Sequence, residues 1–219
     1  VAVVLPLTLL ILRRSPAAAT REPSEDDVDK RVWTTKEILT TSLFWIPFCG
    51  LAPLSMAFGT LQFNLGIIVQ DIGLDGDVTA GLIALTSVSM VLGKLFFGVM
   101  GDRVDHRKLY WVANAATIVA VLLFMNAQSL TVLVIATFAT GISGGGILPL
   151  MGLMYSYRFG VASFGRVMGF GMLTIMAGAI SPIGAGWVYD LYGSYSYAFI
   201  ALIIIMLPSG IAMAWLRER

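Results

Sequence analysis

Charged residues are scarce in this sequence. Only 12% of its residues are Asp, Glu, Lys or Arg, whereas an ordinary soluble domain carries roughly 25%. The chain is also 58% hydrophobic, with a mean hydropathy of +0.85. These values exclude an ordinary soluble domain. They also exclude a disordered chain, which is poor in apolar residues and rich in charge.

Cysteine and histidine are almost absent, since the chain holds one of each, Cys49 and His106. A single cysteine cannot form an intrachain disulfide, and one Cys with one His cannot build a zinc site. The net charge of +1 gives no indication of a nucleic-acid partner. We therefore expect no cofactor, no metal ion and no nucleic acid.

Long apolar runs take the place of the missing charge. Six segments have about the 20 residues that an α-helix needs to cross the hydrocarbon of a bilayer. They span residues 42–69, 78–100, 109–127, 130–155, 167–189 and 196–215. The expected fold class is all-α, a polytopic membrane bundle of six transmembrane helices embedded in a lipid bilayer. Pro47, Pro53 and Pro149 predict kinks within it.

Three regions are expected along the chain. Residues 1–12 are apolar and end at Arg13 and Arg14, so we interpret them as the end of a preceding transmembrane helix. Residues 13–41 mix both charge signs with proline and are typical of a solvated linker. Residues 42–219 form the six-helix bundle.

The distribution of Lys and Arg predicts the orientation. Thirteen of the fourteen lie in the linker, after the second and fourth segments, or at the C-terminus, which share one side if the segments alternate. The connections on the other side contain no Lys or Arg, and their charged residues are all acidic: Asp71, Asp75, Asp77 and Asp190. Since positive loops stay in the cytoplasm, we expect a multi-pass protein of the cell membrane with a cytoplasmic linker and C-terminus.

The connection after the second segment carries a motif. Gly98, Asp102 and Arg103 follow the pattern G-x-x-x-D-R, and Arg107 and Lys108 come after it. This motif resembles the signature loop of the major facilitator superfamily, found after the second helix and again after the eighth. A carboxylate at a helix end can pair with an adjacent arginine and with the N-terminus of a facing helix. We therefore expect Gly98, Asp102, Arg103 and Arg107 to take part in gating. The family usually has glycine where Asp105 stands, so we expect a differently built turn.

A second resemblance lies around the fifth segment. It is similar to the eleventh helix and the following turn of monocarboxylate and oxalate/formate transporters in that superfamily. The matching residues are Ser181-Pro182, Gly186-Trp187, Tyr189-Asp190 and Gly193-Ser194-Tyr195. The two resemblances imply helices seven to twelve of a twelve-helix transporter, built from inverted three-helix repeats. They also imply a partner, the N-terminal half of the same transporter.

Lys94 is the only basic residue inside a segment. A charge at membrane depth is costly unless it faces a cavity or a partner, although a lysine can also extend toward the interface. The resemblance implies that Lys94 stands where carboxylate transporters bind their substrate with arginine. Lysine keeps the charge but not the bidentate fork. Ser87 shares its helix face, and Met90 stands where the animal monocarboxylate branch has an aspartate implicated in proton coupling.

Polar and small residues inside the other segments leave alternatives open. Gln62 and Asn64 are predicted either to contact substrate or to bind neighbouring helices. The spacing of Gly141 with Gly145, and of Gly165 with Gly169, predicts close helix packing, static or sliding.

The function predicted from the sequence is secondary active transport of a small organic anion, similar to a monocarboxylate, by alternating access. Efflux of amphipathic compounds and a membrane sensor without transport are the alternatives. Ser143 stands in a G-x-S-G sequence typical of intramembrane serine proteases. However, the only histidine, His106, lies in a loop, and no base is placed to activate the serine. We do not expect an enzyme.

Overall fold

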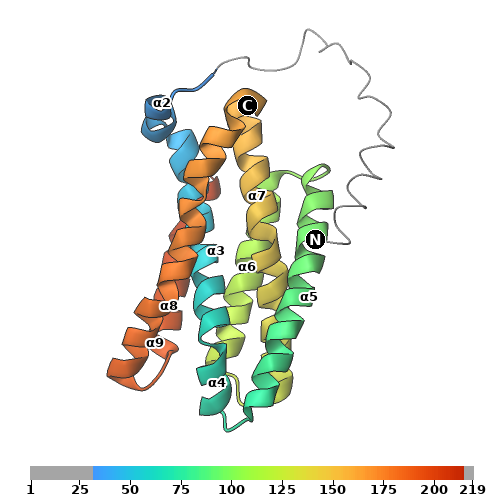
Figure 1. Cartoon of the computed structure of the whole chain (residues 1–219), viewed down its shortest axis with the longest axis vertical. Helices are drawn as coiled ribbons and strands as arrows, with labels where there is room; N and C mark the ends of the chain where they lie inside the picture. Colours follow the sequence, from blue (N-terminus) through green and yellow to red (C-terminus); the bar gives the residue numbers. More distant parts are fainter. Residues whose placement is uncertain (1–31, 215–219) are drawn as a thin grey trace, which may run out of the picture. The chain divides into compact units, whose positions relative to one another are not determined.

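The computed structural model describes residues 32–214, so the predicted helix end at 1–12 and most of the linker lie outside the described residues. Within that range every regular element is an α-helix, which confirms the expected all-α bundle. The long helices run side by side (Figure 1). The helices are α2 (Thr35–Thr40), α3 (Ser42–Phe63), α4 (Leu65–Asp71), α5 (Gly76–Gly101), α6 (His106–Met125), α7 (Leu130–Gly171), α8 (Leu173–Tyr192) and α9 (Ser196–Ala214).

Among residues 32–214, five helical stretches are long and apolar enough to cross a membrane: Ser42–Phe63, Gly76–Gly101, His106–Met125, Leu130–Tyr192 and Ser196–Met213. The fourth has 63 residues. A straight helix of that length would measure about 95 Å, three times the thickness of the hydrocarbon. The predicted fourth and fifth segments both fall within this stretch.

The chain reverses inside α7, at Gly160. This residue has φ 67° and ψ 171°, angles that suit glycine because it has no Cβ. A Cβ atom added to Gly171 would lie 2.6 Å from the Tyr155 ring. In a straight helix these two residues would be about 24 Å apart. Residues 130–159 and 161–192 are therefore two limbs that fold back on each other, as the two predicted segments require.

Interruptions of the helices do not coincide with the prolines. Pro47, Pro53 and Pro149 lie within continuous helical stretches of α3 and α7. The first predicted segment is interrupted instead at Asn64, which separates α3 from α4.

Two helix pairs approach so closely that their backbones touch. At the α3–α8 crossing, a Cβ atom on Gly59 would lie 1.9 Å from the carbonyl oxygen of Gly178. At the α5–α7 crossing, a Cβ atom on Gly145 would lie 2.3 Å from the carbonyl oxygen of Met90. Gly141 also packs on α5, whereas a Cβ atom on Gly165 or Gly169 would have nothing within 4 Å. Of the two predicted glycine pairs, only the first mediates close packing among the described residues.

The helix contacts follow the pattern that two inverted repeats produce. One repeat comprises three helices, α3, α5 and α6. The other comprises the first limb of α7, then the second limb of α7 together with α8 as one member, and finally α9. If each helix is replaced by its counterpart in the other repeat, the α3–α8 contact becomes the α7–α5 contact. In the same way, the α3–α9 contact becomes the α7–α6 contact. All four contacts are present, and α3 and the first limb of α7 lie at the centre.

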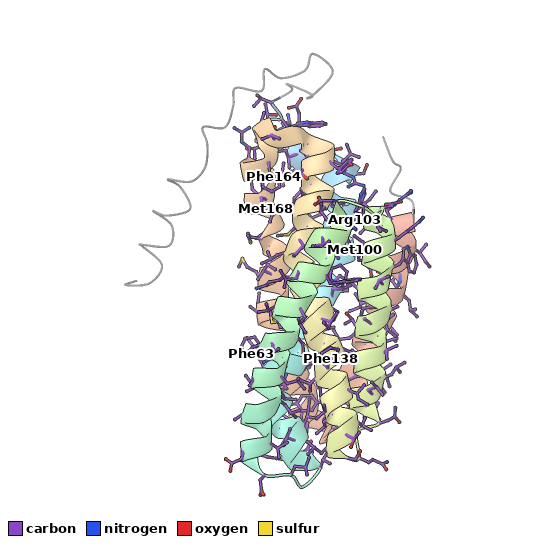
Figure 2. All side chains as sticks on the ribbon, turned by 90° about the vertical axis from the view of Figure 1, so that its right-hand side faces the viewer. Phe63, Met100, Arg103, Phe138, Phe164 and Met168 are labelled. Atoms are coloured by element: carbon purple, nitrogen blue, oxygen red, sulfur yellow. The ribbon has the colours of Figure 1, made fainter. Side chains whose placement is uncertain are left out.

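The charged residues separate to the two ends of the bundle. Figure 2 shows Arg103 near the same end as Phe164 and Met168, while Phe63 and Phe138 lie about halfway along. Hydrogen bonds bring Arg158 to His106 and Arg166 to Trp33 at that end. At the opposite end, the Tyr189 hydroxyl donates to the carboxylate of Asp71. The charge separation used to predict the orientation is therefore present along the bundle, and the cytoplasmic side remains a prediction.

Candidate functional site

Lys94 lies on the exposed surface of α5, two turns after Ser87 on the same face. The Lys94 backbone packs against α7, because a Cβ atom on Gly145 would lie 3.0 Å from the backbone nitrogen of Lys94. The Ser87 hydroxyl donates to the carbonyl oxygen of Ile83 at 3.0 Å, within its own helix. The Lys94 ammonium makes no hydrogen bond or ion pair with any residue that the structure describes. The site therefore offers a positive charge that this part of the chain leaves uncompensated.

Gln62 and Asn64 lie in different environments. Gln62 is partly exposed in the last turn of α3. Asn64 is buried, its Nδ2 donates to the carbonyl oxygen of Thr60 at 3.0 Å, and its Oδ1 accepts from the Tyr195 hydroxyl at 3.0 Å. The geometry thus gives Asn64 a role in joining the end of α3 to the turn between α8 and α9. Substrate contact by Gln62 or Asn64 stays a prediction.

Tyr195 belongs to a small aromatic and polar cluster around Asn64. Its ring stacks on that of Tyr189 at a centroid distance of 4.6 Å, and the Tyr189 hydroxyl lies 2.7 Å from Oδ1 of Asp71. Burial, followed by the nearby Tyr189 and Asp71, raises the pKa of Tyr195 to about 12. The Tyr195 hydroxyl therefore keeps its proton at neutral pH and can donate it to Asn64.

The predicted gating loop is built around a different carboxylate from the one the motif suggested. Asp102 and Arg103 are exposed at the end of α5, and they form no ion pair with each other or with another described residue. Asp105 instead accepts from the Arg107 backbone N–H at 2.8 Å and lies 3.0 Å from the Arg107 guanidinium. It thereby caps the N-terminus of α6.

Gly98 also lies on the exposed surface of α5, where an added Cβ would meet nothing within 4 Å. With Asp102 and Arg103, it forms a surface at the positive end of the bundle that is not packed against the described residues. A gating role for this surface stays a prediction.

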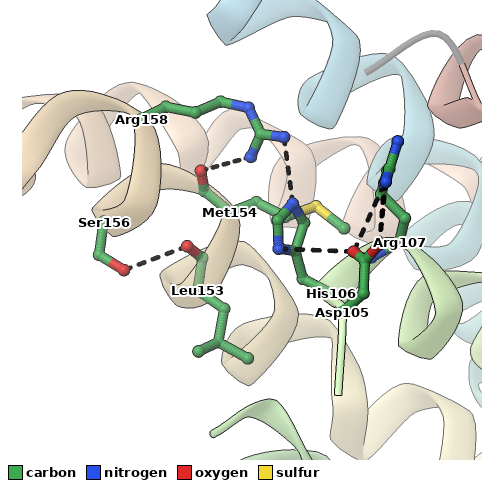
Figure 3. Close-up of polar contacts among 7 residues, drawn as sticks. All are labelled: Asp105, His106, Arg107, Leu153, Met154, Ser156 and Arg158. Atoms are coloured by element: carbon green, nitrogen blue, oxygen red, sulfur yellow. Dashed lines mark hydrogen bonds and ion pairs between the residues drawn. The ribbon is translucent and has the colours of Figure 1, made fainter. Parts of the chain in front are cut away.

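A polar network that the sequence did not reveal joins this loop to α7 (Figure 3). Arg158 is 8% exposed; it donates to the carbonyl oxygen of Met154 at 2.8 Å and lies 3.1 Å from Nε2 of His106. Because a guanidinium can only donate, Nε2 must accept, and the proton of a neutral imidazole then sits on Nδ1. That atom lies 3.8 Å from Asp105. From sequence alone, Arg158 counted only toward the orientation.

The chain also returns to this end at Trp33. The Trp33 backbone N–H donates to the Ser163 hydroxyl at 2.8 Å, and its ring meets that of Phe159 edge to face at 5.2 Å. Arg166 donates to the Trp33 carbonyl oxygen. These contacts join the segment that precedes α2 to the reversal in α7.

Ser143 is buried in α7, and its hydroxyl donates to the carbonyl oxygen of Thr140 at 3.1 Å. His106, the histidine that would have to serve as its base, is engaged with Arg158 instead. The described residues therefore offer no support for a serine nucleophile.

Comparison with known proteins gives one family. The sequence profile of the Major Facilitator Superfamily matches residues 48–219, more than three quarters of the chain. Monocarboxylate transporter 13 of Rattus norvegicus is 28% identical over 138 residues, which cover 60% of this chain and 32% of the relative. An MFS-type transporter of Aspergillus fumigatus is 27% identical over 132 residues, or 59% and 30% of the two chains.

A third relative has a different named activity. The multi-drug resistance efflux pump PmrA of Streptococcus pneumoniae is 25% identical over 146 residues, covering 66% of this chain and 33% of the pump. The chain thus matches about a third of the length of these curated relatives. The family profile agrees with the apolar helix bundle, its repeated contacts and its signature loop, and the chain belongs to the Major Facilitator Superfamily.

Proposed function

We propose that this chain forms the C-terminal half of a secondary transporter for a small organic anion, in which Lys94 binds the anionic group. The observation that carries the proposal is the uncompensated ammonium on the surface of a membrane-spanning helix. Such a charge is costly in hydrocarbon, and a water-filled cavity between two halves would give it a favourable place. The similarity to a monocarboxylate transporter supports the same substrate class.

The second half of the proposed transporter would face α5 and α8. Both helices expose apolar side chains along most of their length, among them Val91 and Leu95 on α5 and Ile175 and Met176 on α8. The relatives are about three times as long as the part that this chain matches, which leaves room for a second bundle. Gly98, Asp102 and Arg103 would contact that half at the cytoplasmic end, and this contact would break when the gate opens.

Within this proposal, Ser87 and Gln62 are the further candidates for substrate contact. Ser87 shares the Lys94 face, and Gln62 is partly exposed. Efflux of amphipathic compounds is the second candidate function, because one relative is named a multi-drug resistance efflux pump. An amphipathic substrate without an anionic group would not need Lys94.

The proposal is tested by anion uptake into vesicles containing the intact protein. Lys94→Gln keeps a side chain of similar length without the charge, and we expect it to reduce carboxylate uptake by about tenfold or more. Lys94→Arg should retain uptake because arginine keeps the charge and adds the bidentate fork. The matched control is Ala84→Gln, which adds the same amide to α5 at an exposed position about 80° around the helix from Lys94.

The outcome that would overturn the proposal is a Lys94→Gln protein with parental uptake and unchanged half-saturation. A different pair of results would favour the efflux function instead. In that case the parental protein takes up no carboxylate, and Lys94→Gln still exports a neutral amphipathic dye.

A further inference from the structure

A groove lies on the flank of the bundle formed by α3, α8 and α9, which takes no part in the proposed Lys94 site. Both α8 and α9 pack more extensively on α3 than on each other, so a gap remains between α8 and α9 over the surface of α3. The cavity has a volume of about 500 Å³. Its floor includes Met56 and Thr60 of α3, and small residues such as Gly184 and Ala201 line its walls. Mainly apolar clefts of this size are typical of ligand sites.

The groove offers hydrocarbon contacts and no charged group. Only two of its lining residues, Thr60 and Ser181, carry polar side chains. The Ser181 hydroxyl lies 2.8 Å from the carbonyl oxygen of Met56, and the Thr60 hydroxyl donates to Ser181 at 3.2 Å. Because both hydroxyls already have partners, a polar ligand would gain little here, whereas an apolar chain would lose no hydrogen bond on entering.

The length of the groove fits one leaflet of a bilayer. Its α8 wall runs from Ala177 to Val188, which corresponds to about 16 Å along a helix. The hydrocarbon core of a bilayer is about 30 Å thick, so each leaflet contributes about 15 Å. One acyl chain, running roughly parallel to the helices, therefore matches the length of the groove.

Exposed aromatic residues mark where the groove meets the membrane surface. The rings of Tyr192 and Tyr197 lie 4.8 Å apart, and they are 62% and 58% exposed. Tyr192 lies one turn beyond the groove on α8, and Tyr197 directly precedes the groove residue Ala198 on α9. Exposed Tyr and Trp residues concentrate at the level of lipid headgroups. The groove is thus continuous with a surface suited to the boundary between headgroups and hydrocarbon.

We propose that this groove binds one acyl chain of a membrane phospholipid, with the headgroup beside Tyr192 and Tyr197. The lipid belongs to the leaflet at the turn between α8 and α9, which the charge distribution predicts to be the outer one. Its chain covers the apolar walls, and its end reaches the Thr60–Ser181 hydroxyl pair. This proposal does not depend on the transported substrate or on Lys94.

The test uses the intact protein in phosphatidylcholine vesicles with two photoreactive phospholipids. One carries a diazirine near the glycerol end of an acyl chain, and the other carries it near the end of the chain. After illumination, the labelled peptides are identified by mass spectrometry. The first probe should label the Tyr192–Tyr197 end of the groove, and the second should label α8 near Ser181 and Ala177.

Variants that fill the groove provide the matched comparison. Ala201→Leu places a larger side chain in the wall, and we expect it to reduce groove labelling about tenfold, because losing two buried methylene contacts has an effect of that size. Gly184→Leu is a second filling variant, since an added Cβ there meets nothing within 4 Å. Ala179→Leu is the control, because residue 179 is exposed on the same helix but does not line the groove.

The proposal is overturned if labelling is spread evenly over the exposed helices, or if both filling variants label like Ala179→Leu. It is also overturned if the groove alone stays unlabelled while neighbouring faces react. That pattern would show that another part of the protein covers the groove.

Discussion

The two backbone crossings of this bundle are built alike and differ in what they present at the surface. At both crossings, glycines allow one helix to touch the backbone of another. Beside the α5–α7 crossing, the surface carries an uncompensated lysine and an exposed serine. Beside the α3–α8 crossing, it carries an apolar groove over a pair of hydroxyls that hydrogen-bond across the helices.

This difference separates the roles of backbone and side chains. The repeated contacts determine where the helices lie, because glycines on both sides bring the main chains together. The residues on the outer faces can then diverge without changing the packing. In the two proposals above, the surface beside one crossing holds a charged solute, and the surface beside the other holds hydrocarbon. The strongest test of this interpretation is to damage each crossing in turn.

The largest effect is expected where a side chain must enter a backbone contact. Gly59→Ala places a Cβ atom 1.9 Å from the Gly178 carbonyl oxygen, and Gly145→Ala places one 2.3 Å from that of Met90. The helices must separate, so each change should cost about 1–3 kcal/mol and lower the melting temperature by about 5 °C. The measurement is the thermal midpoint of the purified protein in detergent.

Gly186→Ala is the control for both variants, because an added Cβ there meets nothing within 4 Å. The two crossings are not equivalent if Gly59→Ala has the same melting temperature as Gly186→Ala while Gly145→Ala has a lower one. In that case the comparison drawn above fails.

A smaller effect is expected at the polar end of the α3–α8 crossing. Tyr195→Phe keeps the ring stacked on Tyr189 but removes the hydroxyl that donates to Asn64. Because Asn64 is only 7% exposed, its amide oxygen loses its partner in a buried position, at a cost of about 1–2 kcal/mol. Tyr189→Phe is the matched change, and its partner Asp71 is exposed, so water can replace the lost bond. Equal unfolding midpoints for the two variants would contradict a structural role for Asn64.

The smallest effect distinguishes the hydroxyls of the two crossings. Ser181→Ala removes the hydroxyl that lies within hydrogen-bond distance of Met56 across the helices, and such bonds contribute about 0.6 kcal/mol in membranes. Ser87→Ala removes a bond within α5 alone and should leave stability unchanged. The comparison requires unfolding curves in a denaturing detergent. A larger loss for Ser87→Ala would mean that this serine has a partner beyond its own helix.

Much of the fold could be predicted from the sequence, because apolar length is a strong signal in membrane proteins. The all-helical class, the segments and the charge separation along the bundle all follow from composition and the positions of Lys and Arg. The reversal at Gly160 falls in the connection predicted between the segments that end at 155 and begin at 167, although the sequence did not single out Gly160 itself. The break at Asn64 was not predicted, and the hydrogen bond that Asn64 accepts there comes from Tyr195, 131 positions away in the sequence.

The candidate site was predicted less completely. Lys94 is conspicuous in an apolar segment, and the structure places it on the exposed surface of α5. Its role in binding substrate stays a prediction. The loop motif directed attention to Asp102, yet Asp105 makes the ion pair, because its position before α6 allows it to cap that helix. Arg158 was not singled out, since its contact with His106 joins residues 52 positions apart.

The Trp33 contacts have a consequence for how the protein is made. The Trp33 backbone bonds to Ser163, 130 residues later in the chain, and the main partner of α3 is α8. At 5–20 residues per second, a ribosome needs roughly 10 s to reach Ser163 after it has passed Trp33. During that time α5, α6 and the first limb of α7 can enter the membrane and pair, while α3 waits for α8. The order of synthesis therefore favours completing the α5–α7 crossing first and closing the α3–α8 crossing, with its groove, last.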